Sequence, residues 1–109
     1  MLAALMLMDL LTEEGCTLHY AGDFDPEGLG MAQRLLARYP DNVKLWRMDL
    51  KSYQQSEPVK QLDQKRLVKL SGIVQEDLRM VADAMERHGK AGYQEALVDV
   101  MMQDVREKI

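Results

Sequence analysis

The apolar and polar positions of the chain change their spacing several times, and each change predicts an element. Residues 2–11 consist of Leu, Met and Ala apart from one Asp, which predicts a buried helix. Residues 16–21 (CTLHYA) lie between two glycines and include Thr and Tyr, which predicts a strand. Residues 43–48 (VKLWRM) alternate apolar with polar side chains and predict a second strand.

A helix is predicted between these two strands. Its apolar residues recur with the spacing of one helix face up to Tyr39, and a Pro-Asp-Asn turn follows. A strand, a helix and a strand within about 30 residues form a βαβ unit, so we expect parallel strands joined by a right-handed crossover.

The pattern beyond Tyr53 is helical. Ser56-Glu57-Pro58 is typical of a helix start, and apolar stripes of helical spacing predict three helices after it. We expect the methionines of these stripes to fill the core, as polarizable and adaptable side chains do; they are Met80, Met85, Met101 and Met102. The prediction is a helix-dominated α/β domain: residues 1–53 form a partial α/β unit, and residues 54–109 form a helical segment of the same domain.

Composition limits the classes of protein that fit. The chain has 109 residues, a net charge of −4 and one cysteine, Cys16, so it has no intramolecular disulfide and too few ligands for a structural Cys/His zinc site. Cys16 is predicted to be a small buried hydrophobe. The apolar run at residues 2–11 is too short for a membrane span and lacks the basic segment of a signal peptide. We therefore expect a cytoplasmic protein that does not enter a membrane.

One candidate for chemistry follows the first predicted strand. Residues i and i+2 of an extended chain point to the same side, so the carboxylates of Asp23 and Asp25 can converge. Ligand sites of α/β sheets lie beyond the carboxyl ends of the strands, and Mg²⁺ is held by one or two carboxylates with waters and phosphate oxygens. The pair therefore predicts a site for Mg²⁺ or Mn²⁺.

A purely structural interpretation competes with this one. Asp25-Pro26-Glu27 has the order of a helix start, with Asp as N-cap and Pro in the first turn, which explains Asp25 without a metal. Asp23 has no such explanation, because a carboxylate at the end of a buried strand is costly unless it is paired.

A family resemblance rests on these residues. The stretch from Tyr20 to Leu29 (YAGDFDPEGL), the helix after it, and Leu45-Trp46-Arg47-Met48 resemble the Toprim-like C-terminal domain of the bacterial DUF2399-type family. That family is similar to the topoisomerase VI A subunit and to the nuclease subunit of Wadjet plasmid-defence systems. The resemblance implies that Asp23 and Asp25 are the Asp-x-Asp motif of a Mg²⁺-dependent site that acts on a DNA phosphodiester.

The same resemblance implies lesser roles for other residues. Gly28 would permit a close backbone approach, and residues 93–97 (YQEAL), with Glu95, are similar to the family's last helix. Arg47 is a candidate phosphate ligand, although an arginine on a half-buried strand is usually only solvated. Lys65 and Arg66 lie in a basic stretch, residues 60–69, that either contacts DNA or is a solvated helix face.

The chain departs from the Toprim pattern at its start. A Toprim domain carries a catalytic Glu on an earlier strand, and no acidic residue precedes Asp9. We therefore expect the C-terminal part of a longer protein, inactive by itself. We also expect a homodimer or larger assembly that covers the apolar surface left by the missing strands. The alternative is a non-catalytic interaction or structural domain in which Asp23 and Asp25 are only cap and turn residues.

Overall fold

The structure, a computed structural model, describes residues 2–108, with side chains over residues 6–107. Helices dominate it, and two small sheets join them. In chain order the elements are α1 (Leu2–Glu13), β1 (Leu18–Tyr20), α2 (Pro26–Arg38), β2 (Val43–Leu45), α3 (Leu50–Gln55), β3 (Lys60–Gln61), α4 (Gln64–Lys69), η1 (Leu70–Gly72), α5 (Glu76–His88), β4 (Lys90–Ala91), η2 (Gln94–Leu97) and α6 (Val98–Lys108).

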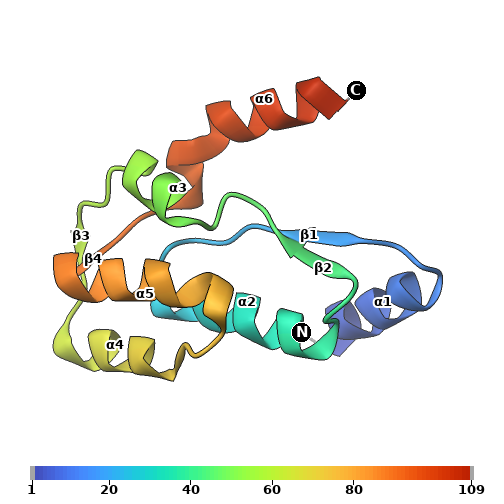
Figure 1. Cartoon of the computed structure of the whole chain (residues 1–109), viewed down its shortest axis with the longest axis horizontal. Helices are drawn as coiled ribbons and strands as arrows, with labels where there is room; N and C mark the ends of the chain where they lie inside the picture. Colours follow the sequence, from blue (N-terminus) through green and yellow to red (C-terminus); the bar gives the residue numbers. More distant parts are fainter. Residues whose placement is uncertain (1, 109) are drawn as a thin grey trace.

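The predicted βαβ unit is confirmed. β1 and β2 pair in parallel, with Leu18 opposite Val43 and Tyr20 opposite Leu45, and α2 connects them. Figure 1 shows the strand pair between two groups of helices: α2, α4 and α5 lie on one side, and α3 and α6 lie on the other. Because the strands are parallel, the loops that follow β1 and β2 leave the pair at the same edge.

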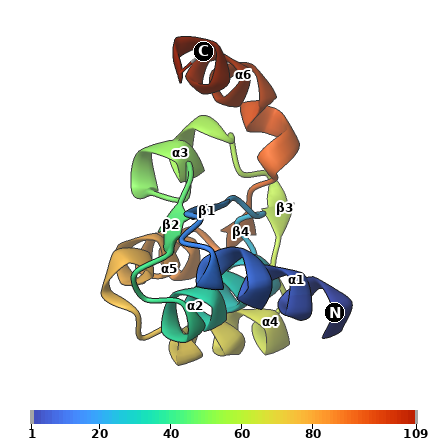
Figure 2. The same ribbon diagram turned by 90° about the vertical axis from the view of Figure 1, so that its right-hand side faces the viewer.

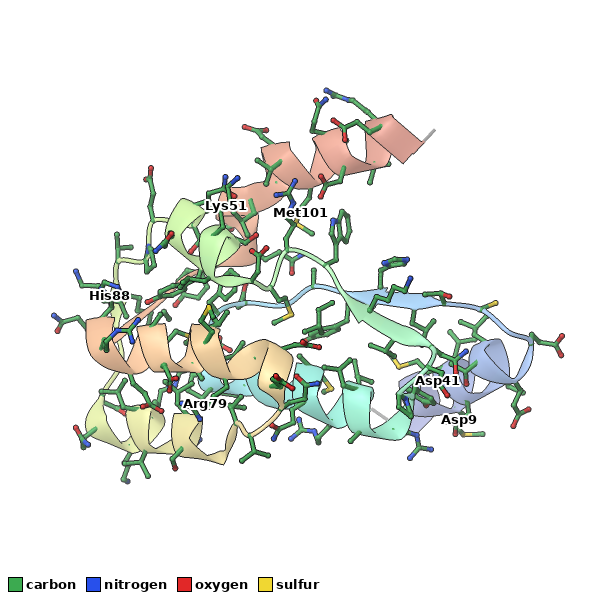
Figure 3. The ribbon with its side chains drawn as sticks, in the orientation of Figure 1. Asp9, Asp41, Lys51, Arg79, His88 and Met101 are labelled. Carbon is green, nitrogen blue, oxygen red and sulfur yellow. The ribbon has the colours of Figure 1, made fainter. Side chains whose placement is uncertain are left out.

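One hydrophobic core draws on both parts of the chain. Phe24, from the loop after β1, is fully buried and meets the ring of Tyr53 edge-on, with 5.5 Å between ring centroids. Leu78 and Met85 of α5 are fully buried in the same core. Arg79 of α5 extends towards η1, where its Nη1 donates to the carbonyl oxygens of Leu70 and Ile73 (Figure 3).

The segment beyond Tyr53 differs from the prediction that it is entirely helical. Ser56-Glu57-Pro58 ends a helix, α3, because the Ser56 N–H donates back to the Ser52 carbonyl and Glu57 takes a left-handed backbone with φ of 51°. The strands β3 and β4, of two residues each, then pair antiparallel. Neither strand is long enough to show an alternating pattern, so periodicity could not have found them.

The terminal helices are more exposed than expected. Met6, Leu7, Leu10 and Leu11 of α1 are at least 36% exposed, so the prediction of a buried first helix is wrong for these four side chains. Met8 is partly buried against the core cluster of Leu35, Tyr39 and Val43. Figure 2 shows α6 reaching away from the rest of the molecule. The expectation of a methionine core holds for Met85 and Met101 and fails for Met80 and Met102, which are 63% and 48% exposed.

The prediction that Cys16 is buried is wrong, because Cys16 is exposed just before β1 begins. Asp9 attaches α1 to the end of α2: its carboxylate accepts hydrogen bonds from Arg38 Nη2 at 2.8 Å and from the Tyr39 hydroxyl at 2.5 Å.

Within residues 2–108, no helix has both the length and the apolar character needed to cross a bilayer.

Candidate functional site

Asp25 opens α2 and is held by it. Its backbone is extended, and its Oδ1 accepts a hydrogen bond of 2.7 Å from the Gly28 N–H, while Pro26 occupies the first turn. The predicted N-cap is therefore confirmed. The second carboxylate oxygen, Oδ2, lies 3.9 Å from Nη2 of Arg66, and the side chain is 16% exposed.

Asp23 has a structural partner that the sequence did not reveal. Its Oδ1 accepts a hydrogen bond of 2.7 Å from the backbone N–H of Gln94, which is 71 residues later in the chain. Next to this contact, the backbones of Phe24 and Gly92 exchange two hydrogen bonds of 2.7 and 3.0 Å. The loop after β1 is thus anchored to the segment that leads into η2.

Phe24 places the two carboxylates on one side. It forms an isolated β-bridge with Gly92 and points into the core. Side chains alternate along an extended chain, so Asp23 and Asp25 face the opposite way from Phe24. Asp23 has one carboxylate oxygen, Oδ2, for which the described residues supply no hydrogen-bond donor.

Gly28 allows the loop to close. A Cβ at Gly28 would lie 2.1 Å from the carbonyl oxygen of Asp23 and 3.1 Å from Oδ1 of Asp25. A side chain at this position would therefore force apart the loop and the first turn of α2. The carbonyl oxygen of Asp23 and the carboxylate of Asp25 therefore both lie against Gly28 in the first turn of α2.

Tyr20 was missed as a site residue. Its hydroxyl lies over the loop, 3.5 Å from the Gly28 carbonyl oxygen, and a Cβ at Gly22 would lie 2.5 Å from it. Burial raises the pKa of the Tyr20 phenol, and the negative charges of Asp25 and Asp23 raise it further. The phenol therefore stays neutral, and its pKa depends on the charge of both carboxylates. A tyrosine that ends a strand three residues before the first aspartate was the available signal.

The two predicted basic residues of α4 differ. Arg66 Nη2 donates to Oε2 of Glu27 at 2.6 Å, so this guanidinium bridges α4 to the first turn of α2. This hydrogen bond holds the pKa of Glu27 below its ordinary value. Lys65 is exposed. The cation nearest Asp25 is therefore one that Glu27 already neutralises.

Arg47 is paired within the chain. Its Nε and Nη2 donate to the carboxylate of Asp104 at 2.8 and 2.6 Å, and the indole N–H of Trp46 donates to the same carboxylate at 2.7 Å. This pairing raises the pKa of Arg47. Asp104 lies in α6 and was not a predicted site residue, because no local pattern connects residues 57 positions apart.

Glu95 lies apart from the carboxylate pair. It is exposed and lines a cavity of about 320 Å³ with Ser56, Glu57 and Tyr93. In the part of the chain that the structure describes, no third His, Cys, Asp or Glu joins Asp23 and Asp25 to make a metal-binding group of three. Asp23 and Asp25 thus share the loop after β1, Glu95 follows Gln94 in η2, and Arg47 and Lys65 lie after β2 and in α4.

The donor chemistry fits a hard cation only in part. Two carboxylates on one side of an extended loop are the ligand type that Mg²⁺ accepts, and this ion commonly takes one or two of them and completes its shell with water and phosphate. Both carboxylates also accept backbone N–H groups through Oδ1. This leaves Oδ2 of Asp23 for a cation, whereas Oδ2 of Asp25 already lies 3.9 Å from Nη2 of Arg66. The residues fit a weak, two-carboxylate Mg²⁺ site.

Comparison with known proteins identifies the family. The family model described as "Protein of unknown function C-terminus (DUF2399)" matches residues 1–105, so the chain belongs to this family. No curated protein and no solved structure matches the chain significantly.

Proposed function

We propose that this protein is a Toprim-like, Mg²⁺-binding domain that takes part in nucleic-acid processing. The observation that carries the proposal is the placement of Asp23 and Asp25 on one side of a loop that leaves the carboxyl end of a parallel strand. Asp25 alone is explained as a helix cap. Asp23 is the residue that an ordinary helix start does not require.

Asp23 and Asp25 would hold the cation through their Oδ2 atoms. When bound, Mg²⁺ would neutralise charge on a phosphodiester and on its leaving oxygen. The chain's own contribution is positioning: the Gln94 N–H and the Gly28 N–H each fix one carboxylate in the loop. Arg66, 3.9 Å from Asp25, limits the negative charge of the pair.

Two carboxylates support binding better than they support catalysis. In the Toprim pattern a glutamate from another strand completes the acidic cluster, so the proposal is that this chain is inactive until another segment or a partner supplies that group. The parent activity would be DNA cleavage or a topoisomerase-like reaction.

Calorimetric titration with Mg²⁺ and Mn²⁺ tests the proposal. Asp23→Asn and Asp25→Asn should each weaken binding about tenfold, or about 1.4 kcal/mol. Asn is as good an N-cap as Asp, so Asp25→Asn removes the charge and keeps the cap. Asp49→Asn is the matched control, because Asp49 caps α3 through the Ser52 N–H in the same way.

The alternative is a non-catalytic interaction or structural domain. Its supporting observation is that both aspartates have structural partners, Asp25 in α2 and Asp23 at η2. If wild type, Asp23→Asn and Asp49→Asn bind Mg²⁺ alike, the alternative holds and the Mg²⁺ proposal fails.

A homodimer remains part of the proposal. Met6, Leu7 and Leu10 form an exposed apolar face on α1, each more than half exposed. A second copy that covers this face would remove it from water. Sedimentation at about tens of micromolar, in the range of ordinary protein interfaces, should show a dimer that Leu7→Glu dissociates. A monomeric wild type would contradict it.

A further inference from the structure

The carboxylate of Asp104 sits in an unusually complete set of donors. Two guanidinium N–H groups of Arg47 and the indole N–H of Trp46 converge on it, all within 2.8 Å. A guanidinium fork accepts a carboxylate and a phosphate in the same two-pronged geometry. The indole nitrogen only donates, so all three groups select for an anion.

These donors are fixed by β2 and not by α6. The backbone N–H of Trp46 donates to the Tyr20 carbonyl at 2.7 Å, which continues the β1–β2 pairing by one residue. Arg47 then adopts a left-handed backbone with φ of 54°, a conformation that costs a non-glycine residue about 1–3 kcal/mol. This backbone conformation turns the chain directly after β2, and the surrounding fold maintains its strain.

In contrast, α6 is held loosely. Across residues 98–107, side-chain hydrogen bonds to other elements are made by Asp104 alone. Met101 is the one buried side chain, and the half-buried Val100 packs beside it against the core. Met101 points from α6 towards the body of the molecule (Figure 3). Val98, Met102 and Val105 are 40–49% exposed.

Space lies beneath the second half of α6. A cavity of about 210 Å³ is lined by His19 of β1, Trp46, Asp104 and Val105. Asp104, which lines this cavity, is 20% exposed, and its partner Arg47 is 30% exposed. An outside anion would therefore reach the donors by displacing Asp104.

We propose that Trp46 and Arg47 form a phosphate-binding site for nucleic acid and that Asp104 occupies this site as an internal competitor. A tethered carboxylate acts at a high effective concentration, so a single phosphate ion does not displace it. A nucleic acid brings many phosphates to one surface and competes better. The choice of nucleic acid over other polyanions rests on the proposed function, whereas the anion site rests on the geometry alone.

The test measures binding of a fluorescein-labelled, single-stranded oligodeoxynucleotide, and of its duplex, in EDTA. Without divalent cations the result does not depend on Asp23 and Asp25, so failure here and failure of the Mg²⁺ proposal can be told apart. Asp104→Asn should bind about tenfold more tightly than wild type, and its logarithmic salt dependence should steepen by about one phosphate contact.

Two matched variants test whether the loss of any negative charge on α6, or the release of any arginine, would have the same effect. Asp99→Asn removes the same charge from α6, where Asp99 is exposed and has no contact with Arg47. Asp9→Asn releases a different arginine, Arg38, from a similar contact on α1. Adding Arg47→Gln to Asp104→Asn should restore weak binding.

A second readout covers the case in which Asp104→Asn does not fold. Trp46 is the single tryptophan of the chain, so its fluorescence reports on the site in the wild type. A saturating oligodeoxynucleotide should change this fluorescence in the wild type.

Three results would overturn the proposal. They are an affinity of Asp104→Asn equal to that of Asp99→Asn, a gain in affinity for Asp9→Asn equal to that for Asp104→Asn, and Trp46 fluorescence that stays unchanged when the wild type is saturated. Polyglutamate of equal charge that binds Asp104→Asn as tightly as the oligodeoxynucleotide would overturn the assignment of the anion site to nucleic acid.

Discussion

The loops after β1 and β2 follow one pattern and differ in the charge of one residue. Asp23-Phe24-Asp25 follows the first strand, and Arg47-Met48-Asp49 follows the second. In both, the middle residue is buried and the last residue caps the next helix. The residue two places before the cap is an acid in one loop and a base in the other.

This difference separates the residues that helix capping explains from those that it does not. Because both caps do the same structural work, Asp25 is explained by α2 as fully as Asp49 is explained by α3. Asp23 and Arg47 are the distinguishing residues. Arg47 already has a full anionic partner in Asp104, whereas Asp23 has a single backbone N–H. The first loop is thus the one with negative charge left to offer a cation.

The largest expected effect comes from closing the space in the first loop. Gly28→Ala places a methyl group 2.1 Å from the Asp23 carbonyl oxygen, and backbone atoms yield poorly, so we expect about 3 kcal/mol of destabilisation in urea unfolding. Gly30→Ala is the control, because its nearest neighbour is Arg34 Nη1 at 3.9 Å. It should be neutral or slightly stabilising. Equal effects would show that the loop is not tightly closed.

A double-mutant cycle on Arg47 and Asp104 measures the coupling free energy of the ion pair that holds the second loop. We expect a coupling of about 1–2 kcal/mol, because the pair is two-pronged and only partly exposed. The matched pair Arg38 and Asp9 is 49% and 39% exposed and should give a smaller coupling, because solvent screens it more strongly. A larger coupling on α1 would contradict the contrast between the two contacts.

The two caps should respond alike. Asp25→Ala and Asp49→Ala should each cost about 1 kcal/mol of the free energy of unfolding, and the corresponding Asn variants only a few tenths. Thermal or urea unfolding checks this. If Asp25→Asn were as damaging as Asp25→Ala, the charge of Asp25 and not its cap would matter to stability.

The smallest effect concerns pH at the edge of the first loop. Arg66 holds the pKa of Glu27 below the ordinary 4.5, so the ion pair stabilises the fold above that pH and is lost as pH falls through the lowered value. Glu27 is 58% exposed, so Glu27→Gln should cost only a few tenths of a kcal/mol at pH 7 and nothing at about pH 2. A gap that persists in acid would contradict this.

Local signals predicted the first half of the fold well. The cap at Asp25, the proline after it and the alternation of residues 43–45 all act within a few residues, and the βαβ unit follows from them. The second half depends on contacts between distant residues. The β3–β4 pairing and the contact of Trp46 with Asp104 have no local pattern.

The site shows the same division. Asp23 and Asp25 were predicted from a local motif, and Gly28 from a resemblance. The Gln94 N–H that holds Asp23 and the tyrosine over the loop come from tertiary packing, and so does the pairing that occupies Arg47. The prediction of a buried Cys16 failed because the residue lies between the turn and the start of β1, outside the strand pair.

Paramagnetic broadening by Mn²⁺ tests the central claim most directly. In amide spectra of the intact chain, small amounts of Mn²⁺ should first erase the signals of Asp23, Asp25 and Gly28, together with that of Gln94, whose N–H donates to Asp23. Mg²⁺ should compete and restore them. Broadening that begins at other acidic residues, such as Glu13 and Glu14, and leaves these four signals intact would contradict the account.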